Sequence, residues 1–172
     1  MRPNLVVFVA LLLMCCVAAL AQAPAPATNL VLGTWTLNLE KSTYSPGRPP
    51  RSSVRQFTAV ENGFIVSTIS GISTQGIPTF TLSAARYDGK NYPLYNQVTL
   101  TDMMINGTKT PNTQAYKVID TYTVEITNRQ NGKVTTTLTR TVSNDGKTMT
   151  LITKGTNAQG QPVHNVEVFD RQ

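Results

Sequence analysis

The stretch Gly33-Thr34-Trp35-Thr36-Leu37-Asn38-Leu39 decides the fold. It contains the only tryptophan of the chain, and from Trp35 onward its odd positions are apolar while its even positions are polar. Alternation with a period of two is typical of a β-strand that buries one face. We therefore predict a first strand over residues 30–39, and we expect the rest of the chain to repeat this pattern.

The C-terminal half repeats it most clearly, between residues 134 and 142. Every odd position from 135 to 141 is threonine, and the even positions are Val134, Thr136, Leu138, Arg140 and Val142. Such alternation favours a sheet, because β-branched side chains lose rotamer freedom in a helix. Turn-forming pairs recur at equal spacing and predict an antiparallel meander with tight hairpins. These pairs are Asn131-Gly132, Asp145-Gly146 and Gln159-Gly160.

The middle of the chain also predicts short strands, separated by turns and one proline-rich loop. We expect that loop over 40–53, because Pro46, Pro49 and Pro50 interrupt a hydrogen-bonded ladder. Turns are expected at Glu61-Asn62-Gly63 and Asp88-Gly89-Lys90, and a short helical turn over 102–105, with no amphipathic helix of useful length. Strands are expected over 54–60, 64–70, 78–87, 97–100, 116–119 and 122–128.

These segments predict an all-β domain of about 8–10 strands. An antiparallel sheet of that size exposes its edge strands unless it closes on itself or splits into two sheets. A closed, up-and-down antiparallel β-barrel is therefore our first expectation. A two-sheet β-sandwich is the alternative.

The N-terminal residues 1–21 have the features of a secretory signal peptide. Arg2 supplies a positive start, Leu5–Leu13 is an apolar run, and Ala19-Leu20-Ala21 fits the small-x-small cleavage pattern. The apolar run is shorter than the ~20 residues of a transmembrane helix. We expect cleavage after Ala21, then an Ala/Pro-rich leader over 22–29 and a single barrel domain over 30–172. The mature protein would be periplasmic or extracellular, without stable insertion in a membrane.

Composition argues against several kinds of chemistry. Both cysteines, Cys15 and Cys16, lie in the signal segment, so the mature chain has no thiol for a disulfide, a nucleophile or a metal site. His164 is the only histidine, so we expect no metal and no cofactor. The net charge of +6 is spread along the chain without a basic run, which argues against binding to nucleic acid.

No set of residues predicts an enzyme. A catalytic Ser-His-Asp arrangement would have to use His164, and no serine lies in a nucleophile elbow. Asp88, Asp102 and Asp145 are better explained as turn-forming residues than as paired catalytic carboxylates. We therefore expect a protein that is not an enzyme.

Gly33-Thr34-Trp35 on the first strand of an all-β meander resembles the calycins, the group of lipocalins, fatty-acid-binding proteins and avidins. A longer ordered set resembles a family of exported bacterial lipocalin-like proteins of unknown function. This set adds Lys41-Ser42, Tyr44-Ser45-Pro46-Gly47, Asp88-Gly89-Lys90, Tyr92-Pro93 and Ser143-Asn144-Asp145-Gly146-Lys147-Thr148.

The resemblance implies a structural role for Trp35 and a binding role for the barrel interior. In lipocalins the matching tryptophan packs across the closed end of the barrel beneath a basic side chain, for which Arg171 and Arg140 are candidates here. The interior would hold a small hydrophobic or amphipathic molecule. Two departures from the pattern are clear: the lipocalin Thr-Asp-Tyr signature is missing, and the proline-rich loop cannot form the helical lid of fatty-acid-binding proteins.

Arg140 is the main candidate for ligand binding, together with Tyr122 and Leu138. Arg140 shares its predicted face with apolar residues, and a buried guanidinium needs a carboxylate partner or an anionic ligand. The alternatives are that this face points outward, or that Arg140 pairs with Glu125, Glu167 or Trp35. The adjacent residues Arg86 and Tyr87 raise the same question.

Other readings stay open for the basic loop and for the protein as a whole. Arg48, Arg51 and Arg55 lie in and after the proline-rich loop, where they would be solvated or would contact an anionic polymer or lipid headgroups. The alternative function is a structural or interaction module of the cell envelope whose barrel is filled by its own side chains.

Overall fold

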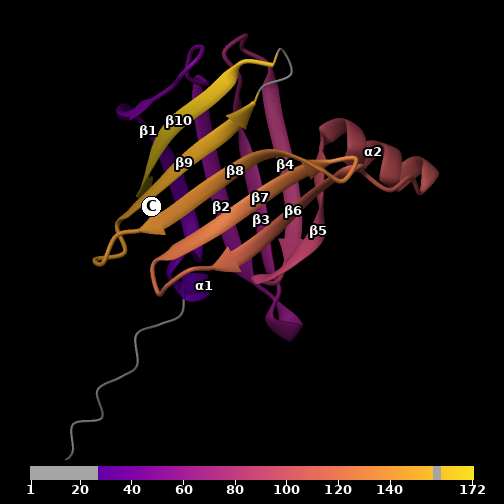
Figure 1. The fold of residues 1–172 in the computed structure, drawn as a ribbon, viewed down its shortest axis with the longest axis horizontal. Helices are drawn as coiled ribbons and strands as arrows, with labels where there is room; N and C mark the ends of the chain where they lie inside the picture. The colour runs from indigo at the N-terminus through magenta and orange to yellow at the C-terminus, as the bar shows by residue number, and fades with distance from the viewer. Residues whose placement is uncertain (1–26, 157–159) are drawn as a thin grey trace, which may run out of the picture.

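The chain forms a closed barrel of ten antiparallel strands, in a computed structural model that describes residues 27–156 and 160–172 (Figure 1). Each strand from β2 to β9 pairs with its two neighbours in the sequence, and β1 pairs with β10 to close the barrel. This is the up-and-down antiparallel barrel that the strand pattern predicted. The sandwich alternative is wrong.

The described elements follow one another with short connections, except where α2 joins β5 to β6. Their bounds are α1 Ala27–Leu30, β1 Gly33–Thr43, β2 Ser52–Ala59, the 3₁₀ turn Glu61–Gly63, β3 Ile65–Ile72, β4 Pro78–Ala85, β5 Asp88–Asn96, α2 Gln97–Asn106, β6 Asn112–Val118, β7 Thr123–Gln130, β8 Lys133–Val142, β9 Thr148–Thr156 and β10 Pro162–Arg171.

The period-two pattern places one face of each strand in the barrel interior. On β8 the even positions Leu138, Arg140 and Val142 are buried, while Thr139 between them is exposed. Apolar burial of this kind contributes about 25 cal/mol per Å² to folding. The largest fully buried apolar side chains are Trp35, Phe169, Met149, Leu151, Val31 and Val124.

Trp35 and Arg171 close one end of the barrel. Trp35 is fully buried, and its Nε1 donates to the carbonyl of Val31, 2.7 Å away. The Arg171 guanidinium lies 4.1 Å from the centre of the indole ring and donates to the carbonyls of Leu30, Leu32 and Gly146. This stacked pair has the arrangement that the resemblance implied.

The first strand begins later and ends later than we expected. Residues 30–32 are not part of it, because their chain crosses the barrel end as a plug, with the carbonyls of Leu30 and Leu32 bound to Arg171 instead of to a strand. β1 then continues to Thr43 and β2 begins at Ser52, so the proline-rich loop is shorter than 40–53.

The segment 97–100 is the clearest correction. It was predicted as a strand, but it is the first turn of α2. Asn96 and Thr99 form a reciprocal capping box, which satisfies the free N–H groups at the helix start, and Gly107 ends the helix in a left-handed conformation. The helical turn predicted over 102–105 lies within α2.

The predicted turns that lie wholly within the described residues are confirmed. The turns at 61–63, 131–132 and 145–146 are confirmed, and Asn62 and Asn131 adopt positive φ angles of 59° and 50°. Asp88-Gly89-Lys90 is also confirmed as a turn, although β5 begins at Asp88: the β4–β5 register, with Ser83 opposite Leu94, centres the reversal on Asp88 and Gly89, and Gly89 has a φ angle of 79°. Of the pair Gln159-Gly160, Gln159 lies outside the described residues.

Candidate functional site

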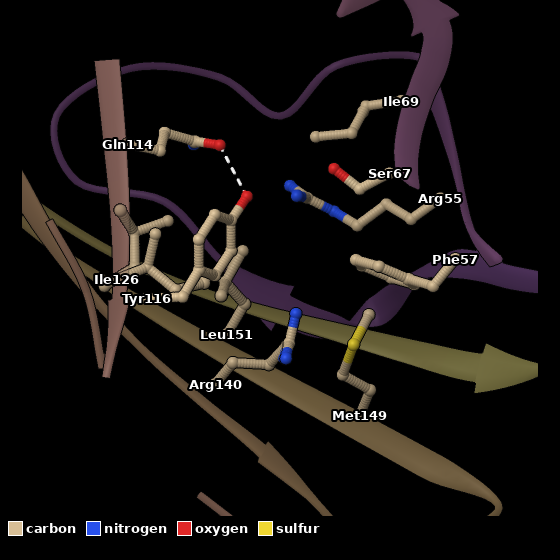
Figure 2. Close-up of a pocket in the computed structure, with 11 residues that line it drawn as sticks. Arg55, Phe57, Ser67, Ile69, Gln114, Tyr116, Ile126, Arg140, Met149 and Leu151 are labelled. Carbon is tan, nitrogen blue, oxygen red and sulfur yellow. Dashed lines mark hydrogen bonds between the residues drawn. The ribbon is translucent and has the colours of Figure 1, made fainter. Parts of the chain in front are cut away.

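A small internal cavity lies between the walls formed by β2, β3 and β6–β9 (Figure 2). It offers about 30 Å³ for the centre of a water molecule, which is room for about two waters. Apolar side chains such as Phe57 and Leu151 form part of its wall, while Arg55, Arg140, Tyr116 and other polar side chains form the rest. The cavity therefore places two cationic side chains among apolar ones.

Arg140 reaches this cavity from β8, and its side chain is only 3% exposed. Its guanidinium lies 5.1 Å from the ring centres of both Phe57 and Tyr87, and Nη2 donates to the Tyr87 hydroxyl at 2.9 Å. No carboxylate among the described residues forms an ion pair with it. Arg140 thus faces inward, and its charge is met only by aromatic rings and one neutral hydroxyl.

The possible partners named from the sequence lie elsewhere. Glu125 alternates with the buried residues Val124 and Ile126, so it is on the outer face of β7. Glu167 faces the interior, but its Oε2 pairs with Nη2 of Arg55 at 3.4 Å. Trp35 is covered by Arg171.

Arg55 is a second inward-facing cation, carried by β2. Its guanidinium lies 4.8 Å from the ring centre of Phe169, and its Nε is buried without a hydrogen-bond partner. Burial lowers the pKa of Arg55; the Glu167 carboxylate raises it, and the charge of Arg140 lowers it further. Figure 2 shows the two guanidinium groups directed into the same cavity from different strands.

The charges at this site do not balance. Glu167 is the single carboxylate in an ion pair with either cation among the described residues, and it also accepts from the Tyr44 hydroxyl at 3.1 Å. Burial and the Glu167 charge raise the pKa of Tyr44, while burial followed by Tyr87 raises the pKa of Tyr116. Both phenols therefore stay neutral, and Glu167 pairs with Arg55 while Arg140 has no ion-pair partner among the described residues.

A chain of hydrogen bonds leads from the cavity toward the rim of the barrel that carries α2. The Tyr116 hydroxyl donates to Gln114 at 2.6 Å, the Gln114 amide donates to Asn128 at 2.8 Å, and the Asn128 amide donates to Thr136 at 2.9 Å. Asn128 also lines an open groove of about 480 Å³ at the rim. The interior wall on this side is therefore polar.

The structure brings together only some of the residues named from the sequence. Arg140 and Leu138 both line the cavity. Tyr122 does not, because it lies in the turn before β7, where its carbonyl accepts from the Val142 amide. His164 is exposed on the outer face of β10.

Arg55 is the site residue that the sequence analysis placed wrongly, in the solvated basic loop. A usable signal was present, since Ser53, Arg55 and Phe57 alternate and Phe57 is a natural core residue. Figure 2 confirms that Arg55 and Phe57 point to the same side of β2.

The described residues offer neither a cluster of metal ligands nor a membrane-spanning helix. In residues 27–156 and 160–172, no cluster of three or more His, Cys, Asp or Glu side chains could hold a metal ion. Within the same ranges, no helix is long and apolar enough to cross a membrane.

Comparison with known proteins supports the fold. No family model and no curated protein matches the chain. Among solved structures, the fluorescent protein UnaG superposes with a TM-score of 0.52 at 11% identity, covering 84% of this chain and 99% of that one. Rv2717c from M. tuberculosis gives a TM-score of 0.52 at 19% identity, covering 86% and 98%. The chain therefore shares the closed β-barrel fold of these structures.

Proposed function

We propose that the protein is an exported barrel that binds an amphipathic small molecule through a carboxylate or an equivalent anionic group. The observation that carries this proposal is the excess of cations in the cavity. Arg55 and Arg140 both line the cavity, Glu167 pairs with Arg55 alone, and Arg55 Nε has no hydrogen-bond partner. An unpaired charge in a buried site is costly, so an anion that enters would be strongly favoured.

A carboxylate suits the donors that are present. Its two oxygens accept from a guanidinium in a bidentate manner, which Lys could not match. The free Nε of Arg55 and the guanidinium of Arg140 supply such donors, and the neutral Tyr116 hydroxyl lies on the same cavity wall. We assign Arg55 and Arg140 to binding of the anionic group.

The rest of the ligand would extend toward the rim. The cavity holds an anionic group but not a whole molecule, and the hydrogen-bonded wall of Gln114 and Asn128 leads out to the groove of about 480 Å³. Apolar contacts from Leu138 and Ile126 lie on the same side. A molecule with both apolar and hydrogen-bonding parts fits this wall better than a plain hydrocarbon.

Export is part of the proposal and is supported by the sequence. The apolar run Leu5–Leu13 and the cleavage pattern ending at Ala21 favour secretion to the periplasm or beyond. The resemblance to exported bacterial lipocalin-like proteins agrees with this location. N-terminal sequencing of the protein recovered from its native host tests it: cleavage after Ala21 supports export, and an intact Met1 start argues against it.

A second function, a structural envelope module with a filled barrel, is favoured by one observation. The cavity of about 30 Å³ is small, so side chains already occupy most of the interior. This function requires that no ligand reach the arginines.

Isothermal titration calorimetry with N-octanoylglycine and its primary amide, N-octanoylglycinamide, separates the two functions. The two compounds differ only in the charged group. We expect the acid to bind the wild type ~10-fold or more tightly than the amide, as one or two charge-assisted hydrogen bonds imply. Arg140→Met and Arg55→Met should each remove that preference.

Arg48→Met is the matched control, because Arg48 is exposed in the proline-rich loop. It should keep the preference of the wild type. Equal binding of acid and amide, or binding of neither, would overturn the proposed function. Binding of neither, with a folded protein, would support the filled barrel.

A further inference from the structure

The helix α2 exposes apolar side chains that the barrel does not cover. Val98 is 76% exposed, Met104 is 75% exposed and Ile105 is 74% exposed. None of the ten residues of α2 is buried, and the helix projects sideways from the upper rim in Figure 1. These apolar side chains therefore do not contribute to the core of the barrel.

The apolar surface continues from α2 onto the barrel rim. Ile77, in the turn before β4, is 62% exposed and lines a groove of about 370 Å³ with Phe80 and Val98. We call Ile77, Val98 and Ile105 the rim surface, because Val98 lines one groove with Ile77 and another with Ile105. It spans two elements that are separate in the sequence, so it is a patch and not a set of scattered residues.

Basic side chains surround the rim surface. Arg51 lies against Gly76, next to Ile77, because a Cβ added at Gly76 would be 3.1 Å from Arg51 Nη1. Lys109 is exposed in the connection after α2. Lys133 is exposed on the β7–β8 hairpin, whose turn residue Asn131 donates to the carbonyl of Pro111 at the end of that connection.

The rim that carries α2 is more positively charged than the closed end. In the described connections at the rim, Arg48, Arg51 and Lys109 stand against one acid, Asp102, which accepts from the Asn106 amide. At the closed end the charges balance: Glu61, Asp120 and Asp145 stand against Arg86, Lys147 and the Arg171 guanidinium that covers this end. The molecule presents its positive end and its exposed apolar side chains in the same direction.

We propose that the rim surface docks on an anionic lipid surface. The rim surface exposes apolar side chains near Arg51 and Lys109, and in interfacial binding apolar groups enter the headgroup region while cations remain with the lipid charges. The positive charge of the rim favours an orientation with α2 toward the lipid. This inference does not rest on the proposed ligand.

Co-sedimentation with vesicles tests the inference with the mature chain. Vesicles of phosphatidylglycerol and phosphatidylcholine should bind the wild type more tightly than phosphatidylcholine alone, and high salt should weaken the binding. The double variant Val98→Ser/Ile105→Ser should weaken partitioning ~10-fold or more, because both side chains are exposed and their removal leaves the core intact. Arg51→Gln/Lys109→Gln should reduce the preference for anionic vesicles.

Ile119→Ser supplies the matched control, because Ile119 is 53% exposed at the closed end. It should bind vesicles like the wild type. Full binding by Val98→Ser/Ile105→Ser, or no binding of the wild type to anionic vesicles, would overturn the inference. A concentration-dependent dimer that this double variant abolishes, without vesicle binding, would assign the rim surface to a second copy of the chain instead.

Discussion

Replacing Arg140 by methionine should stabilise the protein while it removes ligand binding. The substitution forfeits the hydrogen bond to the Tyr87 hydroxyl and two contacts with aromatic rings. These are worth about 2–4 kcal/mol together. Against this, the variant no longer buries an unpaired cation, which costs several kcal/mol, and methionine fills irregular space well.

The net change in the free energy of unfolding should be a gain of about 1–3 kcal/mol. This corresponds to a rise in melting temperature of about 3 °C or more. Urea denaturation followed by circular dichroism measures the change directly, at pH 7 and without ligand. A decrease of more than about 1 kcal/mol in the free energy of unfolding would refute the reasoning, because it would show that Arg140 stabilises the fold instead of serving only to bind a ligand.

Arg171→Met is the matched comparison and should have the opposite sign. Its guanidinium donates to three carbonyls and lies over the Trp35 ring. Removing it should destabilise the protein by about 3–5 kcal/mol, because the carbonyls that cover the closed end lose their donors. Equal effects of the two substitutions would show that the two arginines play the same structural role.

Three further predictions concern stability. Gly71→Ala should lower the free energy of unfolding by about 2–3 kcal/mol in urea denaturation, because a Cβ there would lie 2.2 Å from the Ser52 carbonyl oxygen. Gly63→Ala is the control: a Cβ there meets no atom within 4 Å, so the variant should lose only about 1 kcal/mol, from the positive φ angle. Trp35→Phe should lower stability by about 2–4 kcal/mol in a circular-dichroism melt, because the Val31 carbonyl loses its donor and a void forms; an unchanged melt would contradict a structural role. The melting temperature should stay level from pH 7 to pH 5 and fall toward pH 2, because hydrogen bonds from Ser143 and Lys147 hold the pKa of Asp145 below 3.8, and other donors lower the pKa of Asp120 and Asp170. A carboxyl group whose pKa is lower in the folded than in the unfolded state stabilises the fold above the unfolded-state pKa, and this stabilisation is lost as the pH falls through the folded-state pKa. Asp145→Asn should therefore make the melting temperature depend less on pH in the acid range.

The barrel could be predicted from the sequence because its causes are local. Alternation of buried and exposed positions places Leu138 and Val142 on one face of β8, and the Asn131-Gly132 turn sets the hairpin. α2 could not be predicted in the same way. Val98, Thr99 and Thr101 are β-branched and favour a strand, and the capping box between Asn96 and Thr99 reverses that preference only once the helix has formed.

The site was harder to predict than the fold because it depends on pairing between distant residues. Whether Arg140 faces inward follows from the closure of the barrel, and the same closure brings Glu167 to Arg55, 112 positions away in the sequence. Because Arg55 is close to Arg48 and Arg51 in the sequence, it was expected in a solvated loop. The strand β2 begins at Ser52, however, and the Arg55 side chain points into the barrel. The net charge inside a barrel can be counted only when every inward-facing residue is known.

The arginine Nε–Hε signals in a ¹H–¹⁵N NMR spectrum test the central claim most directly. The signals of Arg55 and Arg140, assigned with the two methionine variants, should shift when N-octanoylglycine is added and should stay in place with N-octanoylglycinamide. The signal of the exposed Arg48 should not respond to either compound. If only exposed arginines respond to the acid while Arg55 and Arg140 remain unchanged, the cavity does not bind an anion.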